Sequence, residues 1–277
     1  MVNEADVRLF ADKCKAIFEQ VGRDIIGQED IVELTVIAMI AGGNVLLEGV
    51  PGIGKTRLIR SLGRVFSLPF SRIQFTPDLM PADITGTNVL EKDEKGNAVY
   101  TFRPGPIFSH IVLADEINRA TPKSQSALLE AMQEHTVTVD GKDYRMEEPF
   151  FVLATQNPIE QEGTYPLPEA QLDRFMFKLR VGYPSRSEEA AVIQRMAPPA
   201  ATVGAVAVAG LEDIVNARNL VDRIYIDDKI VEYILDLVIA TRPGARAELS
   251  ARQSGAKLDE LAGLISYGAS PRASIAL

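Results

Sequence analysis

Residues 49–56 are Gly49-Val50-Pro51-Gly52-Ile53-Gly54-Lys55-Thr56, which fits the pattern G-x-x-x-x-G-K-[ST]. An apolar run, residues 44–48, precedes this stretch, and a helical pattern, residues 57–62, follows it. Glycines allow successive backbone N–H groups to converge on an anion, because no Cβ atom stands in the way. The order strand, glycine-rich loop, helix therefore predicts a phosphate-binding loop, with a tight turn that binds no ligand as the alternative. In such a loop Lys55 contacts the β- and γ-phosphates of a nucleotide, and the Thr56 hydroxyl ligates Mg²⁺.

The composition limits the classes of protein to consider. With 277 residues, the chain is long enough for a main domain and a smaller second one. Its 29 Lys and Arg against 38 Asp and Glu give a net charge of −9, which disfavours a protein whose main task is to grip nucleic acid. A single cysteine excludes an internal disulfide. The sequence has neither a secretory leader pattern nor an apolar run long enough for a membrane span, so we expect a soluble, cytoplasmic protein.

Strand and helix patterns alternate after the glycine-rich loop. Strands are predicted at residues 72–76, 110–114, 150–155 and 177–181, and helices at residues 122–135 and 167–175. This alternation predicts an α/β fold with a parallel sheet flanked by helices. Two further segments, residues 87–102 and 136–146, have the pattern of β-hairpins. Pro184 closes the sheet region and the pattern becomes helical from Ser187, so we predict an α/β nucleotide-binding domain over residues 1–184 and a smaller all-α domain over residues 185–277.

Polar side chains stand where two of these strands end. Asp115 and Glu116 follow an apolar strand, at the edge of an open α/β sheet where ligands bind. We expect Asp115 to hold Mg²⁺, directly or through water, and Glu116 to orient and deprotonate the attacking water. Asn157 follows another apolar strand and could contact the γ-phosphate or the lytic water. The alternatives are a solvated turn for the two acids and an Asx-type turn before Pro158 for Asn157.

Several motifs occur in a fixed order along the chain, and together they point to a known family. They are residues 49–56, Asp115-Glu116, Ala154-Thr155-Gln156-Asn157-Pro158, Leu172-Asp173-Arg174-Phe175 and Gly268-Ala269-Ser270-Pro271-Arg272. This set resembles a AAA+ ATPase, and residues 102–108, 115–120 and 167–175 resemble the MoxR branch. The resemblance implies a P-loop NTPase domain followed by an all-α lid. Because the lids of this family continue beyond the position that Arg272 matches, we expect the lid to be truncated at Leu277.

The resemblance also implies roles for individual residues. Asn157 matches the sensor-1 position, and Arg272 matches the sensor-2 arginine of the lid. Arg174 matches the arginine finger, which reaches into the ATP site of a neighbouring subunit, with Arg119 as a rival candidate. The alternative for Arg174 is a surface ion pair with Asp173 or Glu169. Nucleotide-binding residues complete the set: Ile26 and Gly27, which match the segment lining the adenine pocket, and Gly49, Val50, Pro51, Gly52, Ile53, Gly54, Lys55, Thr56 and Arg57.

For the whole protein, the resemblance implies Mg²⁺-dependent ATP hydrolysis that drives chaperone-like remodelling or maturation of partner proteins. It further implies a homo-oligomeric ring, a hexamer, and a partner that carries a von Willebrand factor A domain. A nucleic-acid motor is the alternative from another class. Its support is the basic residues near the hairpins, but acids lie beside each of them and no aromatic stacking platform accompanies them. A third possibility is a nucleotide-gated switch with negligible turnover.

Overall fold

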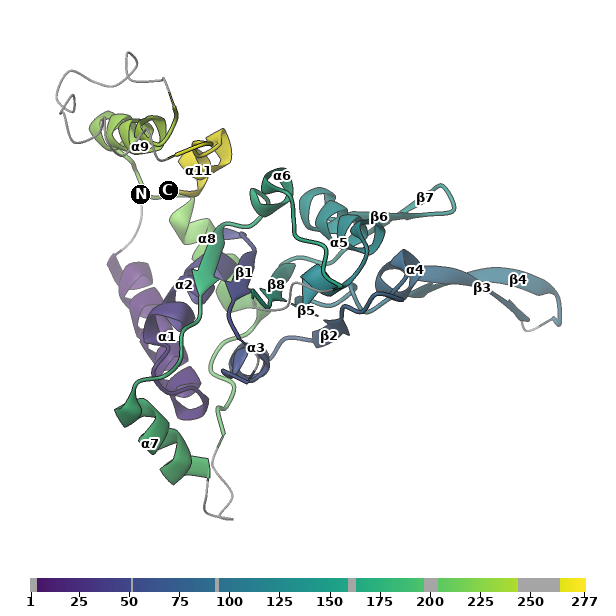
Figure 1. The fold of residues 1–277 in the computed structure, drawn as a ribbon, viewed down its shortest axis with the longest axis horizontal. Coiled ribbons are helices and arrows are strands. Elements are labelled where there is room, and N and C mark those ends of the chain that lie inside the picture. Colours follow the sequence, from purple (N-terminus) through teal and green to yellow (C-terminus); the bar gives the residue numbers. More distant parts are fainter. Residues whose placement is uncertain (1–3, 51, 93–94, 159–162, 197–203, 244–264) are drawn as a thin grey trace. The chain divides into compact units, whose positions relative to one another are not determined.

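A computed structural model describes residues 4–50, 52–92, 95–158, 163–196, 204–243 and 265–277 (Figure 1). Pro51, one of the expected nucleotide-binding residues, lies outside the described residues. The chain forms two compact units, Met1–Val221 and Asp222–Leu277, and each is described by itself. No helix in the described part of the chain is long and apolar enough to cross a membrane.

A five-stranded parallel sheet forms the centre of the first unit, in the order β2-β5-β8-β1-β9. Its strands are β1 (Val45–Glu48), β2 (Phe70–Gln74), β5 (Ile111–Asp115), β8 (Phe151–Gln156) and β9 (Phe177–Arg180). The predicted α/β class with a parallel, helix-flanked sheet is confirmed. The strand that precedes the glycine-rich loop lies between β8 and β9, so the loop emerges inside the sheet rather than at its edge.

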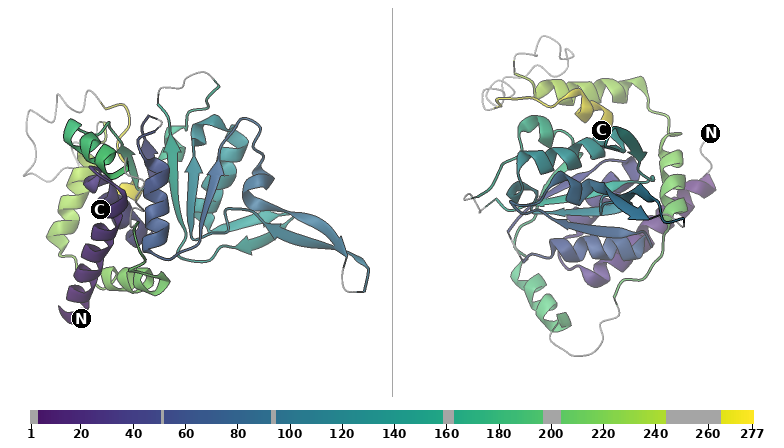
Figure 2. Two further views of the ribbon diagram at one scale, coloured as in Figure 1. Left: turned by 90° about the horizontal axis from the view of Figure 1, so that it is seen from below. Right: turned by 90° about the vertical axis from the view of Figure 1, so that its right-hand side faces the viewer.

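Helices cover both faces of this sheet (Figure 2). The helices of the first unit are α1 (Glu4–Asp24), α2 (Glu29–Ala41), α3 (Lys55–Val65), α4 (Pro81–Thr85), α5 (Pro122–Glu134), α6 (Glu169–Leu172), α7 (Arg186–Met196) and α8 (Leu211–Val221), with a short 3₁₀ turn, η1, at Ile117–Arg119. Successive strand residues point to opposite faces, so Val45 and Leu47 pack with α1, α2, α3 and α8 while Leu46 packs with α4 and α5. All three side chains are fully buried, as strands covered on both faces require.

Both predicted hairpins are present. β3 (Gly86–Lys92) pairs with β4 (Ala98–Pro104), and β6 (Thr136–Val139) pairs with β7 (Lys142–Arg145). The Phe102 and Tyr144 rings stack with their centroids 3.7 Å apart, and Asn88 donates to Asp140 at 2.6 Å. These contacts join the two hairpins, and the longer one extends away from the sheet (Figure 1).

The first unit continues beyond residue 184, where the sequence pattern places the domain boundary. Arg195 of α7 donates to the carbonyl oxygens of Gly22 and Arg23 at the end of α1. Ile214 and Ala217 of α8 are buried against the α1 and α2 side of the core. By its contacts the unit therefore ends at Val221. The division of the chain into functional domains at residues 184 and 185 stays a prediction.

The second unit is helical in its described residues, with α9 (Asp228–Ala240) and α11 (Pro271–Ala276). Asp227 caps α9 by accepting a hydrogen bond from the backbone N–H of Lys229. The two helices are joined by hydrogen bonds from Arg242 Nε to the Ala269 carbonyl (3.1 Å) and from the Ala269 N–H to Thr241 Oγ1 (2.8 Å).

Candidate active site

The glycine-rich loop runs from the end of β1 at Glu48 to the start of α3 at Lys55. Gly52 and Gly54 have φ angles of +85° and +92°, in the left-handed region that favours glycine. At Gly49, a Cβ atom would lie 2.7 Å from the Val181 carbonyl oxygen. Each of these glycines is thus required by its backbone conformation or by a close approach, and the loop wraps around the N-terminus of α3.

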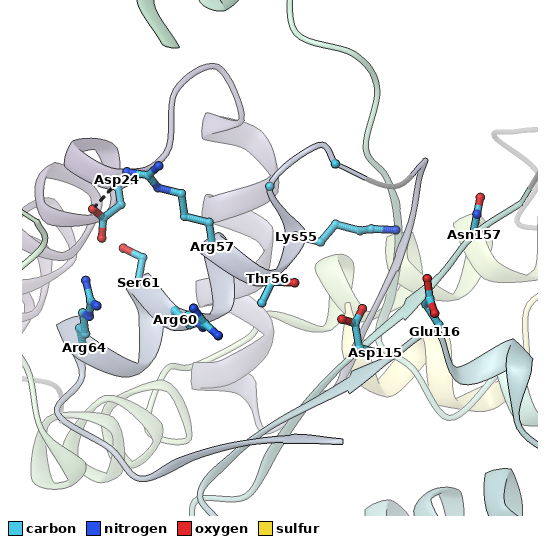
Figure 3. A pocket seen from close by; sticks show the side chains of 12 residues that line it. Asp24, Lys55, Thr56, Arg57, Arg60, Ser61, Arg64, Asp115, Glu116 and Asn157 are labelled. Carbon is cyan, nitrogen blue, oxygen red and sulfur yellow. Dashed lines mark ion pairs between the residues drawn. The ribbon is translucent and has the colours of Figure 1, made fainter. Parts of the chain in front are cut away.

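A cavity of about 620 Å³ lies beside this loop (Figure 3). It is lined by Asp24, Gly52, Gly54, Lys55, Thr56, Arg57, Arg60, Ser61, Arg64, Asp115, Glu116 and Asn157. The structure therefore brings together the loop, the two acids at the end of β5 and the amide after β8, as the sequence predicts. Gly49 and Val50 are not among the described residues that line it.

Lys55 lies between the loop and the two acids. Its Nζ donates to the carbonyl oxygens of Gly49 (2.6 Å) and Gln156 (3.4 Å). Burial lowers the pKa of the Lys55 ammonium, and the nearby charges of Asp115 and Glu116 oppose that shift. The positively charged Lys55 ammonium is therefore held at the end of the sheet, where the phosphates of a nucleotide would need a positive charge.

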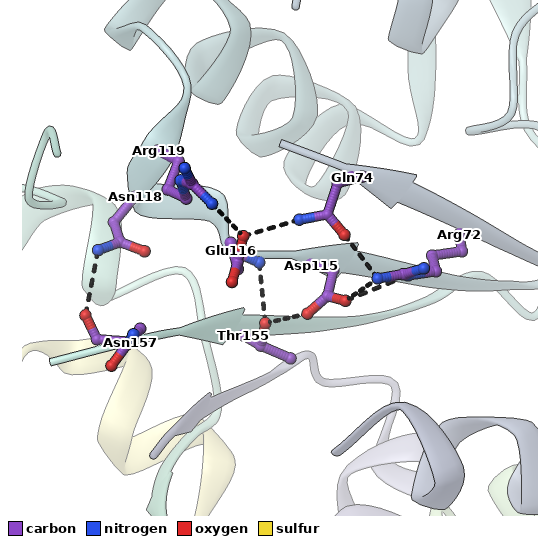
Figure 4. Close-up of polar contacts among 8 residues, drawn as sticks. All are labelled: Arg72, Gln74, Asp115, Glu116, Asn118, Arg119, Thr155 and Asn157. Atoms are coloured by element: carbon purple, nitrogen blue, oxygen red, sulfur yellow. Dashed lines mark hydrogen bonds and ion pairs between the residues drawn. The ribbon is translucent and has the colours of Figure 1, made fainter. Parts of the chain in front are cut away.

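Both oxygens of the Asp115 carboxylate are engaged by neighbouring strands (Figure 4). Oδ1 accepts a hydrogen bond from Thr155 Oγ1 at 2.6 Å. Oδ2 accepts from Arg72, with Nη2 at 2.7 Å and Nε at 3.1 Å. Because the Asp115 side chain is only 11% exposed, these contacts fix the direction in which it points.

Glu116 has a left-handed backbone, with φ 58° and ψ 48°, which is uncommon for a residue other than glycine. Its N–H donates to Thr155 Oγ1 at 2.9 Å. Its Oε2 accepts from Gln74 Nε2 at 2.8 Å and from Arg119 Nη1 at 3.0 Å. The surroundings therefore hold Glu116 in a strained conformation, and Arg119 contacts this acid within its own chain.

Three residues of this network were missed by the sequence analysis: Arg72 and Gln74 on β2, and Thr155 on β8. The sequence gives only a weak indication that these three residues belong to the site. Thr155 lies within the polar end of a buried strand, and Arg72 and Gln74 alternate with Ile73 along β2.

A second, more apolar cavity of about 490 Å³ adjoins the loop on the side of α7. Ile26, Ile53 and Tyr183 line it, and it shares Asp24, Gly52, Gly54 and Arg57 with the first cavity. Gly27 does not line it among the described residues, but Gly27 has a φ of +70° and a Cβ atom there would collide with the Glu188 carboxylate. Ile26 thus lines a cavity next to the loop that has room for the base of a bound nucleotide.

The remaining predicted residues differ in their placement. Asn157 is 4% exposed and accepts a hydrogen bond at its carbonyl from Asn118 Nδ2 (3.3 Å). Arg174 is half-buried between α6 and β9 and does not line either cavity among the described residues. Arg272 belongs to the second unit, in α11, where its N–H donates to Ser270 Oγ. The functional roles of all three stay predictions.

The donors beside Lys55 fit Mg²⁺. Thr56 offers a hydroxyl and Asp115 a carboxylate, and these hard oxygen ligands are the kind that Mg²⁺ prefers. Among the described residues, no group of three or more His, Cys, Asp or Glu could hold a metal without help. In phosphoryl-transfer sites, substrate phosphates and waters complete the Mg²⁺ shell.

Comparison with known proteins is consistent with this geometry. Residues 44–177 match the family described as "ATPase family associated with various cellular activities (AAA)". The chain is 48% identical to the uncharacterized protein YeaC of Bacillus subtilis over 94% of its length and 74% of that relative. It is 44% identical to Chaperone MoxR1 of Mycobacterium tuberculosis over 95% of its length and 66% of that relative.

A crystal structure of a Cytophaga hutchinsonii protein, to which ATPase activity is attributed, superposes with a TM-score of 0.85. That protein is 41% identical, and the match covers 99% of this chain and 79% of the other. The glycine-rich loop, the acids at the end of β5 and these relatives lead to one conclusion: the chain belongs to the MoxR family of AAA+ ATPases.

Proposed function

We propose that this ATPase hydrolyses ATP in a Mg²⁺-dependent reaction and uses the cycle to remodel partner proteins as a homo-oligomeric ring. The observation that carries the proposal is that Lys55 and Thr56 face Asp115 and Glu116 across the same cavity. A phosphate-binding loop opposite a metal ligand and a base is the minimum set for phosphoryl transfer to water.

Each residue then has a defined task. Backbone N–H groups of the glycine-rich loop and the Lys55 ammonium bind the β- and γ-phosphates, while Thr56 and Asp115 hold Mg²⁺. Bound Mg²⁺ neutralises charge that develops on the phosphates. Glu116 accepts a proton from the attacking water, and its hydrogen bonds with Gln74 and Arg119 orient its carboxylate.

Three further side chains act on the phosphates in this proposal. Asn157 lies in the same cavity and positions the water or the γ-phosphate. Arg272 reaches the γ-phosphate from the lid. Arg174 completes the site of the adjacent subunit, where an arginine in trans is worth about 10³ to 10⁵ in rate.

The remodelling role rests on the relative named Chaperone MoxR1. We propose a hexameric ring located in the cytoplasm and a partner with a von Willebrand factor A domain. A nucleic-acid motor is less favoured, because the charges on the hairpins are balanced. Arg103 of β4, for example, forms an ion pair with Glu91 of β3 at 3.2 Å.

The Glu116→Gln variant tests the assignment of the base. Gln keeps the shape and an oxygen for the contacts with Gln74 and Arg119, but it cannot accept a proton. We expect ATP binding, measured by isothermal titration calorimetry, to survive, while phosphate release falls by about 10²-fold or more. Glu130→Gln, at an exposed position of α5, is the matched control. Hydrolysis at the wild-type rate by Glu116→Gln would reject the assignment.

A further inference from the structure

The side chain of Arg72 contacts the expected metal ligand. Arg72 lies on β2, the edge strand of the sheet, and Gln74 of the same strand pairs with Asp115 in the register. Its Nη2 and Nε both donate to Asp115 Oδ2, at 2.7 and 3.1 Å. Thr155 occupies the other oxygen of the same carboxylate. Asp115 therefore has a charged partner of its own before any cation arrives.

The same guanidinium extends the contact to the second acid. Arg72 Nη2 donates to Gln74 Oε1 at 2.6 Å, and Gln74 Nε2 donates to Glu116 Oε2 at 2.8 Å. Arg119 contacts that oxygen from the other side. Arg72 thus begins a chain of hydrogen bonds that places both acids, and it brings a positive charge to within contact distance of one of them.

The charges around the cavity show what this arrangement does to a free cation. The cavity is lined by four basic side chains (Lys55, Arg57, Arg60 and Arg64) and three acidic ones (Asp24, Asp115 and Glu116). Arg72 and Arg119 add two more positive charges in direct contact with the acids. Without a nucleotide, the carboxylates that a divalent cation would bind are therefore already neutralised by arginines. A bound nucleotide adds phosphate charge, which favours binding of the cation.

We propose that Arg72 is a positioning residue that holds Asp115 and lowers the affinity of the nucleotide-free site for a divalent cation, so that the cation enters together with the nucleotide phosphates. This inference rests on the Mg²⁺-dependent hydrolysis proposed above. In this proposal Arg72 makes cation binding depend on the nucleotide. The glycine-rich loop and the acids do not provide this dependence.

Binding of Mn²⁺ to the nucleotide-free protein tests the inference, with free Mn²⁺ followed by electron paramagnetic resonance. We expect Arg72→Met to bind Mn²⁺ about tenfold more tightly than the wild type, because it removes the competing charge from Asp115. Arg72→Lys keeps the positive charge that opposes the cation and is expected to remain within about twofold of the wild type. Addition of Asp115→Asn to Arg72→Met should abolish the gain, which locates the added binding at that carboxylate.

The variants are expected to fold, because the Arg72 side chain is 43% exposed on an edge strand. Thermal unfolding checks this directly. Arg103→Met is the matched control, since Arg103 forms an exposed ion pair on the hairpin outside the cavity. Its Mn²⁺ affinity should equal that of the wild type.

Equal or weaker Mn²⁺ binding by folded Arg72→Met would overturn the inference, and so would equal gains in Arg72→Met and Arg72→Lys. The proposed function fails separately. If wild-type protein hydrolyses ATP without a divalent cation, or does not hydrolyse it at all, the proposed mechanism is wrong whatever the Arg72 variants bind.

Discussion

At the scale of single residues, one hydroxyl group joins the two acids of the site. Thr155 Oγ1 donates to Asp115 Oδ1 and accepts from the Glu116 N–H, and the Thr155 side chain is fully buried. The left-handed backbone conformation of Glu116 costs about 1–3 kcal/mol for a residue other than glycine. A fixed hydrogen-bond partner for the Glu116 N–H is therefore needed to maintain this conformation. Thr155 therefore sets the position of the metal ligand relative to the base.

The Thr155→Val variant isolates this contribution, because valine has the same shape but no donor or acceptor. We expect the free energy of unfolding to fall by about 1–3 kcal/mol, since a carboxylate oxygen and an N–H lose their buried partner. We expect kcat to fall about tenfold with little change in ATP affinity, because the Lys55 contacts are untouched. Chemical denaturation and steady-state kinetics measure the two effects. Thr155→Ser should restore both values, and an unchanged kcat in folded Thr155→Val would contradict this role.

The sequence pattern predicted the residues with a chemical role and missed the roles of those that hold them in place. Lys55, Thr56, Asp115, Glu116 and Asn157 come from contiguous patterns, and the structure places all of them around one cavity. Arg72, Gln74 and Thr155 act through pairing between strands that are distant in the sequence. The register of those pairs depends on packing across the whole sheet, which a single sequence does not reveal.

At the scale of elements, one acid at the carboxyl end of β1 joins three neighbouring strands. Glu48, the last residue of β1, accepts hydrogen bonds from Gln156 Nε2 of β8 (2.9 Å) and from Lys178 Nζ of β9 (2.5 Å). Gly49 follows Glu48 directly, and Gln156 precedes Asn157. These bonds therefore hold the start of the phosphate-binding loop against the strand that carries Asn157.

The charge on Glu48 gives this junction a dependence on pH. The hydrogen bond from Lys178 is the main cause of a pKa below the usual value for Glu48, with a smaller contribution from Gln156. A carboxyl whose pKa is lowered by folding contributes stability above its unfolded pKa, and that stability is lost as the pH falls through the folded value.

We therefore expect Glu48→Gln to lower the free energy of unfolding by about 0.5–1 kcal/mol near pH 7, and the difference from wild type to shrink as the pH falls below about 4.5. Urea denaturation of both proteins between pH 3.5 and 8 measures the difference. Glu130→Gln, at an exposed position of α5, serves as a control for a general charge effect. A difference between wild type and Glu48→Gln that does not change with pH would contradict the assignment.

The elements themselves were predicted with uneven accuracy, for a physical reason. Strands and hairpins were predicted to within about two residues because apolar runs and the turn residues that bound them are local signals. The helix predicted at residues 167–175 is only Glu169–Leu172, because Met176 already donates to the Asn44 carbonyl and begins the pairing of β9 with the sheet. The contacts of α7 and α8 with α1 were not foreseen, since the sequence shows that a helix has an apolar face but not which element covers it.

At the scale of the whole molecule, Arg174 raises the question of how many chains make one site. It follows α6 and does not line either cavity of its own chain among the described residues. If Arg174 completes the site of a neighbouring subunit, hydrolysis requires two chains in a ring with head-to-tail contacts. If Arg174 acts within its own chain, each chain is an independent catalyst.

A mixture of two inactive variants separates these cases. Lys55→Ala lacks phosphate binding but keeps Arg174, and Arg174→Ala keeps Lys55 but cannot complete the neighbouring site. In an equal mixture, a site is whole wherever an Arg174→Ala chain receives the arginine of a Lys55→Ala chain, so ATPase activity should recover to about one quarter of wild type when subunits mix at random. Each variant alone should stay inactive at the same total concentration. Phosphate release measures the recovery, and size-exclusion chromatography verifies that the mixed chains assemble. Assembled mixtures without recovered activity would place Arg174 outside the neighbouring site and return Arg119, which already contacts Glu116 in its own chain, to consideration as the arginine that acts on the phosphates.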